Sequence, residues 1–216
     1  MDSKFARFLA AYPPEANSPR PVDAPSLAAH VRRQFGMAVP KALTEFWSSV
    51  GSGYFGDREL YFFGDGAAAG PRDPLIAWNR MDVWDDIFPD KAERPLLFAE
   101  TFCGDQLGFR HVGRQCWVEL LAIDTFQIFI ITEDFDELFT AILIERSALA
   151  EEEAYKNMRR HLGPLPDGVH YAPILSPLAG GTTDPDNHHF ETPNVHVRTS
   201  LATYQALARA TKKRGR

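Results

Sequence analysis

The fold of this chain is decided by residues 96–132, which read LLFAETFCGDQLGFRHVGRQCWVELLAIDTFQIFIIT. Four short runs in this stretch are rich in aromatic, leucine and β-branched residues, and turn-forming residues separate them. The runs lie at 96–100, 107–110, 116–121 and 126–132. Because consecutive short strands joined by tight turns pair antiparallel, this stretch predicts the centre of an antiparallel sheet.

A helix is predicted directly after this sheet. Asp134 is a suitable cap, Glu137 stands three residues later, and apolar residues between 135 and 143 recur at helical spacing. Residues 151–160 continue as a charged segment that we expect to face solvent, and 162–193 are rich in proline and glycine. A closing helix then has one apolar side, formed by Leu201, Tyr204 and Leu207.

The chain before the sheet predicts an arm, helices and one strand. Residues 12–25, YPPEANSPRPVDAP, contain five prolines and no apolar period, so we expect structure to begin after them. Two short amphipathic helices are predicted at 26–36 and 40–51, and a strand at 59–63. A further short helix at 82–88 has an apolar inner side and an acidic outer side.

Length and composition favour one domain with an extension. The 216 residues are 44% hydrophobic and 12% aromatic, which is enough to bury a substantial core. No window approaches the roughly 18 uncharged apolar residues of a membrane span, and the first residues do not resemble a secretory signal. Two cysteines, Cys103 and Cys116, are too few for a disulfide scaffold. We therefore expect a cytoplasmic protein that does not bind membranes.

The charge is unevenly distributed along the chain. The five basic residues within 209–216 leave a charge of −11 on residues 1–208, against −6 for the whole chain. An acidic surface repels nucleic-acid phosphates and attracts basic proteins. The charge therefore predicts a basic protein partner and no nucleic acid.

Several short motifs follow one another in a recognisable order between residues 39 and 139. The run VPKALTEFW followed by GSGYFG is similar to the helix-and-glycine signature near the start of SUKH domains. Later pieces occur in the order of that family, and the resemblance covers about residues 26–146. The matching segments are 39–47, 51–56, 59–63, 98–100, 104–109 and 135–139.

The tail carries a second resemblance. GPL at 163–165, PIL at 173–175 and GG at 180–181 are similar to a segment of immunity proteins against type VI secretion toxins. The prolines imply an N-terminal arm at 1–25, and the resemblances imply a SUKH-like domain at 26–146. They also imply a C-terminal helical extension at 147–216 that packs on this domain, with a separate lobe as the alternative.

The resemblance also implies a fold and a function. The fold is α+β, with a single twisted, mainly antiparallel sheet and flanking helices. Bacterial members are mostly immunity proteins that bind and occlude a cognate secreted toxin, and a nuclease is one candidate for that toxin. Such a protein is not an enzyme and needs no cofactor. Members in fungi and viruses serve regulatory binding roles, so a regulatory scaffold protein is an alternative.

The acidic side of the predicted helix at 82–88 is the first candidate for a partner-binding surface. Asp82, Asp85 and Asp86, with Asp90 just beyond, place like charges at i, i+3 and i+4, where they weaken an isolated helix. A basic partner would offset that repulsion. The alternative is that these acids only keep an exposed face soluble.

A second candidate surface surrounds the glycine turn. Asp57 and Glu59 supply charge there, and Tyr54 and Phe55 would be contact anchors if they are exposed. The alternative for the two aromatic residues is packing on the sheet edge. Because no lysine followed by Ser or Thr comes after the last glycine, the turn does not match a phosphate-binding loop.

The enzymatic alternative rests on the 186–196 loop. Asp186, His189 and His196 are types of residue that bind zinc, so a small hydrolase or a metal-binding enzyme is the rival function. Their spacing matches no established ligand pattern, and a polar surface loop is the other reading. Cys103 has acidic neighbours, which raise the pKa of a thiol. We therefore assign no catalytic residue.

Overall fold

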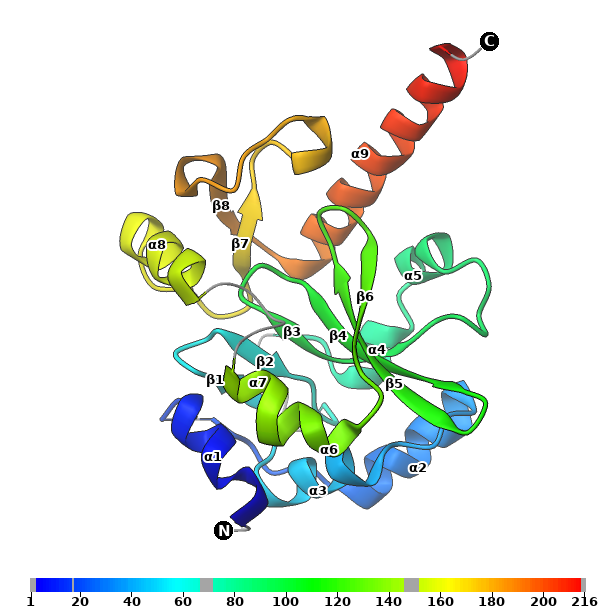
Figure 1. Ribbon diagram of the computed structural model, residues 1–216, viewed down its shortest axis with the longest axis vertical. Coiled ribbons are helices and arrows are strands. Elements are labelled where there is room, and N and C mark those ends of the chain that lie inside the picture. Colours follow the sequence, from blue (N-terminus) through cyan, green and yellow to red (C-terminus); the bar gives the residue numbers. More distant parts are fainter. Residues whose placement is uncertain (1–2, 17, 67–71, 146–151, 215–216) are drawn as a thin grey trace.

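The computed structural model describes residues 3–16, 18–66, 72–145 and 152–214, and its centre is a six-stranded sheet (Figure 1). The strands follow one another in chain order, and all neighbours are antiparallel. They are β1 (Gly53–Phe55), β2 (Leu60–Phe62), β3 (Leu96–Thr101), β4 (Gln106–Val112), β5 (Gln115–Ala122) and β6 (Gln127–Thr132). The predicted α+β class with an antiparallel sheet is confirmed.

Helices that carry phenylalanine cover one face of the sheet. Phe46 packs between Phe62 and Phe139, with ring centroids 4.6 and 4.7 Å away. Phe5 and Phe8 complete this cluster and are fully buried, so aromatic rings dominate the main core. The helices are α1 (Ser3–Ala11), α2 (Ala24–Phe35), α3 (Lys41–Ser49), and the continuous α6 (Phe135–Glu137), η1 (Leu138–Ile142) and α7 (Leu143–Glu145).

Helix α1 lies within the region 1–25 that we expected to be an arm, and for this helix the expectation is wrong. Phe5, Phe8 and Tyr12 recur at i, i+3 and i+7 and are all buried. The prolines that follow do run in an extended segment beside β1. The proline-rich composition of 12–25 thus correctly indicates an extended second half of the region 1–25, but it gives no indication of the short amphipathic helix α1 in the first half.

Two short helices, α4 (Leu75–Asn79) and α5 (Val83–Ile87), pack on the other face. Trp78 stacks on Phe63 with ring centroids 5.6 Å apart, and Trp84 meets Trp78 edge-on at 5.4 Å. The indole N–H of Trp78 donates to the side-chain oxygen of Gln106 at 2.8 Å. Helix α5 was predicted from its apolar side, whereas α4 was not.

The C-terminal part adds a smaller core beside β3. Tyr155 and Met158 are the buried side of α8 (Glu152–Leu162), which otherwise faces solvent as expected, and they pack with Phe102 and Tyr171. A hairpin of β7 (His170–Pro173) and β8 (His188–Glu191) follows. Between these strands lie the short turns η2 (Pro177–Ala179) and η3 (Pro185–Asn187).

The last helix, α9 (Pro193–Arg214), begins inside the fold and ends outside it. Val197 and Leu201 belong to the main core, and the rest of the helix extends away from the body (Figure 1). In the part of the chain that the structure describes, no helix is both long enough and apolar enough to span a membrane.

Candidate functional site

A surface groove of about 370 Å³ opens where the end of α5, the β5–β6 turn and α9 meet. We call it the acid-rimmed groove. Its apolar lining is Ile87, Phe88, Pro89, Phe126, Ile128, Leu201 and Tyr204, and its rim is Asp86, Asp90 and Glu93. Asp86 and Asp90 are two of the predicted contact residues. None of the lining residues is basic, so the groove combines apolar surface with three carboxylates at its rim.

Local backbone geometry holds both walls of the groove. Pro89 ends the helical segment because proline cannot continue a helix, and the Asp90 carboxylate then accepts a hydrogen bond from the N–H of Ala92 at 2.9 Å. On the opposite wall, Phe126 has a φ of 55°, and its N–H donates to the carbonyl of Ala122 at 2.7 Å. Because the backbone of Phe126 is in the left-handed conformation, the chain reverses here and the Phe126 ring lies against Tyr204 of α9.

The other two predicted acids are already paired within the protein. Asp82 forms an ion pair with Arg198 of α9 at 2.5 Å, and Asp85 forms one with Arg94 at 2.9 Å. The first ion pair connects α5 to α9, and the second connects it to the segment before β3. The predicted acidic face is therefore divided, because Asp82 and Asp85 form ion pairs within the protein, whereas no ion pair among the described residues involves a carboxylate of the groove rim.

The edge strand β6 borders the groove and is unusually apolar for its exposure. Ile128, Phe129 and Ile130 are 46%, 48% and 54% exposed. The sequence predicted this strand but not its exposure, because a continuous apolar run is typical of a strand buried on both faces. Which faces of the strand are covered depends on elements far apart in the chain, which the run itself does not encode.

The aromatic residues of the glycine turn are buried, so their assignment as contact anchors is wrong. Phe55 is fully buried in the main core, and Tyr54 is buried beside it. The Tyr54 hydroxyl accepts hydrogen bonds from the N–H of Gly168 at 3.0 Å and from Nε of Arg72 at 3.2 Å. Both residues pack at the sheet edge, which was the alternative.

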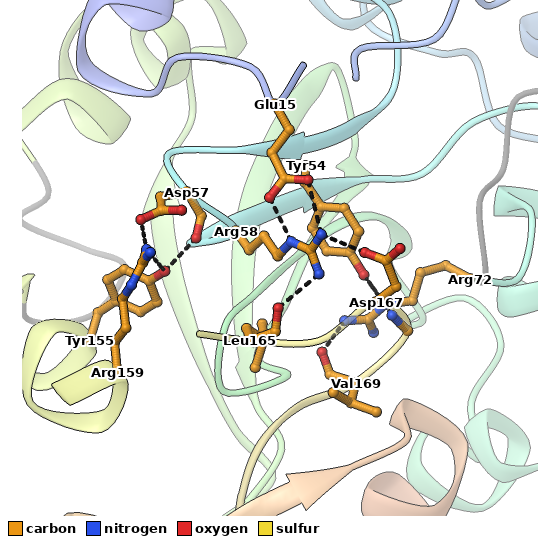
Figure 2. A network of polar contacts seen from close by, with 11 residues as sticks. Glu15, Tyr54, Asp57, Arg58, Arg72, Tyr155, Arg159, Leu165, Asp167 and Val169 are labelled. Atoms are coloured by element: carbon orange, nitrogen blue, oxygen red, sulfur yellow. Dashed lines mark hydrogen bonds and ion pairs between the residues drawn. The ribbon is translucent and has the colours of Figure 1, made fainter. Parts of the chain in front are cut away.

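The charged residues of the same turn hold the C-terminal extension (Figure 2). The Asp57 carboxylate forms an ion pair with Arg159 of α8, and the hydroxyl of Tyr155 donates to the Asp57 carbonyl. Glu59 is half-buried, and its backbone carbonyl accepts a hydrogen bond from Phe102 at 2.9 Å. These contacts give Asp57 a structural role in this protein, and the Glu59 backbone links the start of β2 to the end of β3.

Arg58 is at the centre of this network (Figure 2). Its Nε lies 2.5 Å from a carboxylate oxygen of Glu15, and its Nη2 lies 2.6 Å from Asp167. Its Nη1 donates to the carbonyl of Leu165 at 2.8 Å. One guanidinium thus joins the N-terminal arm, the β1–β2 turn and the C-terminal extension, which explains why a non-glycine residue occupies a φ of 78° here.

The three residues proposed for a metal-binding loop lie apart. Asp186 pairs with His161 of α8 at 2.8 Å, His189 is exposed on β8, and His196 is buried in α9. Within the described ranges, no three His, Cys, Asp or Glu side chains are grouped as metal ligands. The proposed metal-binding loop at 186–196 is therefore not formed.

A buried histidine pair, which the sequence did not indicate, secures the start of α9. Nδ1 of His196 lies 2.9 Å from Nε2 of His170, and Nε2 of His196 lies 2.8 Å from a carboxylate oxygen of Asp124. Burial, with smaller contributions from His196 and Arg72, holds the pKa of His170 well below its ordinary value. The pair ties α9 to β7 and to the β5–β6 turn, and both rings are enclosed.

Cys103 is a poor nucleophile in this environment. Burial, together with the negative charges of Asp105 and Asp124, raises the pKa of its thiol well above the ordinary value. A thiol in such surroundings stays protonated and unreactive at neutral pH.

No protein-family model and no curated protein matches this sequence. Among solved structures, the chain is similar to Atu4351 from Agrobacterium tumefaciens, with a TM-score of 0.58 and 14% sequence identity. The match covers 91% of this chain and 87% of that one, so the fold that the two proteins share includes the C-terminal extension.

Proposed function

We propose that this chain is a non-catalytic, cytoplasmic protein-binding protein of SUKH type, an immunity protein that binds a basic secreted toxin and occludes it. The acid-rimmed groove is the observation that carries this proposal. It offers apolar contact area from Phe126, Ile128 and Tyr204 beside the carboxylates of Asp86 and Asp90, the pattern of an apolar contact centre with a charged rim.

The charges of the groove support a basic partner. The rim carboxylates have no basic neighbour in the lining, and the body of the chain is strongly acidic. Such a surface accelerates association with a positively charged protein and discriminates against acidic ones. A toxin that binds nucleic acid needs a positive surface for its substrate, and covering that surface would inhibit it.

The structure offers less to the enzymatic alternative. A hydrolase that uses the 186–196 loop requires its polar residues to converge, whereas Asp186 and His189 point to different surroundings and His196 is buried in the histidine pair. A regulatory scaffold would use the same groove, and the identity of the partner separates it from an immunity protein.

Growth rescue tests the proposal. The chain is co-expressed with the product of each adjacent open reading frame, and survival is scored. We expect one neighbour to be toxic alone, to be tolerated when the chain is present, and to co-purify with it at equal stoichiometry. If no neighbour is toxic or none co-purifies, the immunity function is rejected.

Two variants make the rescue assay specific for the groove. Asp86→Lys combined with Asp90→Lys reverses the rim charge at exposed positions, and we expect it to abolish rescue. Asp184→Lys is the matched control, because Asp184 is also an exposed aspartate but lies before η3, outside the groove lining. Equal rescue by both variants would reject the groove as the binding site.

A further inference from the structure

The two edges of the central sheet differ in how they are covered. Along β1, Arg20 and Ser52 form a bridge whose N–H groups donate at 2.8 and 3.0 Å, and Pro14 bridges Phe55. The glycines of the turn permit this approach, because an added Cβ at Gly51 would collide with the carbonyl oxygen of Arg20. The N-terminal arm therefore closes the β1 edge.

The described residues provide no such cover for the β6 edge. Strand β6 ends the sheet, and among the described residues no strand or isolated bridge pairs with its outer side. Its sequence, QIFIIT, contains neither charge nor proline, and its side chains are exposed on both faces as far as Ile130. Natural proteins protect such edges with charges, prolines or bulges because an open apolar edge pairs with other chains. The register shift of β6 falls at Ile131, after the exposed residues, so the stretch 127–130 keeps regular pairing with β5.

We infer that the open edge of β6 is a docking strand, to which the partner adds an extended segment as a seventh strand of the sheet. Backbone hydrogen bonds would supply affinity, and side chains at alternate positions would supply specificity. The inference rests on the proposed function and deepens it, because it states how the partner is held beside the acid-rimmed groove.

The surroundings of β6 define the chemistry of that segment. Ile128 faces the groove, whose rim carries Asp86, Asp90 and Glu93, while Phe129 points to the opposite face of the sheet. Successive side chains of an added strand also alternate between these faces. The segment therefore carries lysine or arginine on the groove face and apolar residues on the other face.

The same charges argue against a second copy of this chain as the occupant. Pairing of two β6 strands would bring together two proteins that each carry a net charge of −6, with an acidic rim beside each strand. Like charges across an interface oppose association. The acidic rim would attract a basic segment, whereas it would repel a second copy of the chain.

Hydrogen–deuterium exchange tests the inference with the full chain and the toxin identified by growth rescue. In the free protein, we expect alternate amides of residues 127–130, where β6 pairs regularly with β5, to exchange rapidly, because only half of them point toward β5. In the complex, the rapidly exchanging half should become protected by at least about tenfold. If the complex forms and these amides exchange at their free rates, strand addition is wrong while the proposed function stands.

Two other outcomes are informative. Failure to form any complex would overturn the proposed function and the inference together. Protection that rises with the concentration of the chain alone would show that a second copy occupies β6, which also overturns the inference.

A pair of lysine substitutions distinguishes an effect on binding at the β6 edge from the effect of a charge added elsewhere on the surface. Ile130→Lys places a charge on the edge at a position that is 54% exposed, so we expect an unchanged melting temperature and binding weakened at least about tenfold. Ile174→Lys is the control, since Ile174 is 65% exposed and lies after β7. Unchanged binding of Ile130→Lys, with the fold intact, contradicts the inference.

Discussion

The ring of Tyr204 on α9 packs edge-on against the ring of Phe126 in the β5–β6 turn, with centroids 5.6 Å apart. This contact joins the last helix to the outermost hairpin of the sheet and forms one wall of the acid-rimmed groove. Tyr204 is nevertheless 46% exposed. Its ring is thus placed both to shape the groove and to contact a partner.

Removal of this ring should affect binding more than stability. Because Tyr204 is about half exposed, we expect Tyr204→Ala to lower the free energy of unfolding by less than about 1 kcal/mol. Aromatic anchors at interfaces contribute about 2 kcal/mol or more, so affinity for the toxin should fall by more than about tenfold. Titration calorimetry and thermal melts measure both effects. Tyr204→Phe, which keeps the ring, should bind normally, and equal affinity of the Ala and Phe variants would count against this wall as a contact surface.

Substitution of Arg58 should loosen the C-terminal extension. Lysine keeps the charge but lacks the planar fork that contacts Glu15, Asp167 and the Leu165 carbonyl together (Figure 2). We expect Arg58→Lys to destabilise the fold by about 1 to 3 kcal/mol, because several charge-assisted hydrogen bonds are lost from a largely buried site.

Chemical denaturation measures this effect, and Arg33→Lys is the control because Arg33 is exposed on α2. Proteolysis of the Arg58→Lys variant should begin in residues 152–214. Equal denaturation midpoints for the two variants would show that the network does not stabilise the fold.

Asp105 should make stability fall as pH rises. Burial raises the pKa of Asp105 to about 6, although the N–H of Ile123, which donates to its carboxylate at 2.9 Å, opposes this shift. The unfolded chain releases the same proton near its ordinary value of about 4. Between these values the folded state binds more protons than the unfolded state, so stability decreases with increasing pH and the full penalty applies above pH 6.

The variant Asp105→Asn tests whether this carboxylate makes stability fall as pH rises. The asparagine oxygen can still accept from Ile123, and the variant cannot ionise. We expect it to be more stable than the parent by on the order of 1 to 3 kcal/mol at pH 8 and nearly equal to it at pH 4. A variant that is less stable than the parent at pH 8 would contradict the account of this carboxylate.

Strands β2 to β6 could be predicted because each is a short apolar run bounded by turn residues. Strand β1 was not predicted, because it lies in the glycine-rich segment 51–56, which was interpreted as a turn. Helix α1 was not predicted, because the proline-rich composition of 12–25 was taken to describe the whole region 1–25. The burial of Phe5 and Phe8 also depends on Phe46 and Phe139, which lie far along the chain. Local pattern determines which residues form an element, whereas long-range contacts determine whether a helix this short is stable.

The site shows the same division. The acidic pattern around α5 identified Asp86 and Asp90 correctly as exposed carboxylates, but it could not distinguish them from Asp82, whose partner Arg198 is 116 residues away. Tyr54 was ambiguous for the same reason, since its hydroxyl is buried by Gly168 and Arg72 from other segments. The groove itself requires the approach of α9 to the β5–β6 turn, which no local motif encodes.

The most direct test of the central claim is the affinity between the purified chain and the toxin found by growth rescue, measured for the parent, for Asp86→Lys with Asp90→Lys, and for Asp184→Lys. We expect the groove variant to lose at least about 1.4 kcal/mol of binding free energy, a tenfold change, mostly through slower association at low salt. The control should bind like the parent. Equal affinity of all three proteins at low salt would show that the acid-rimmed groove does not bind the partner.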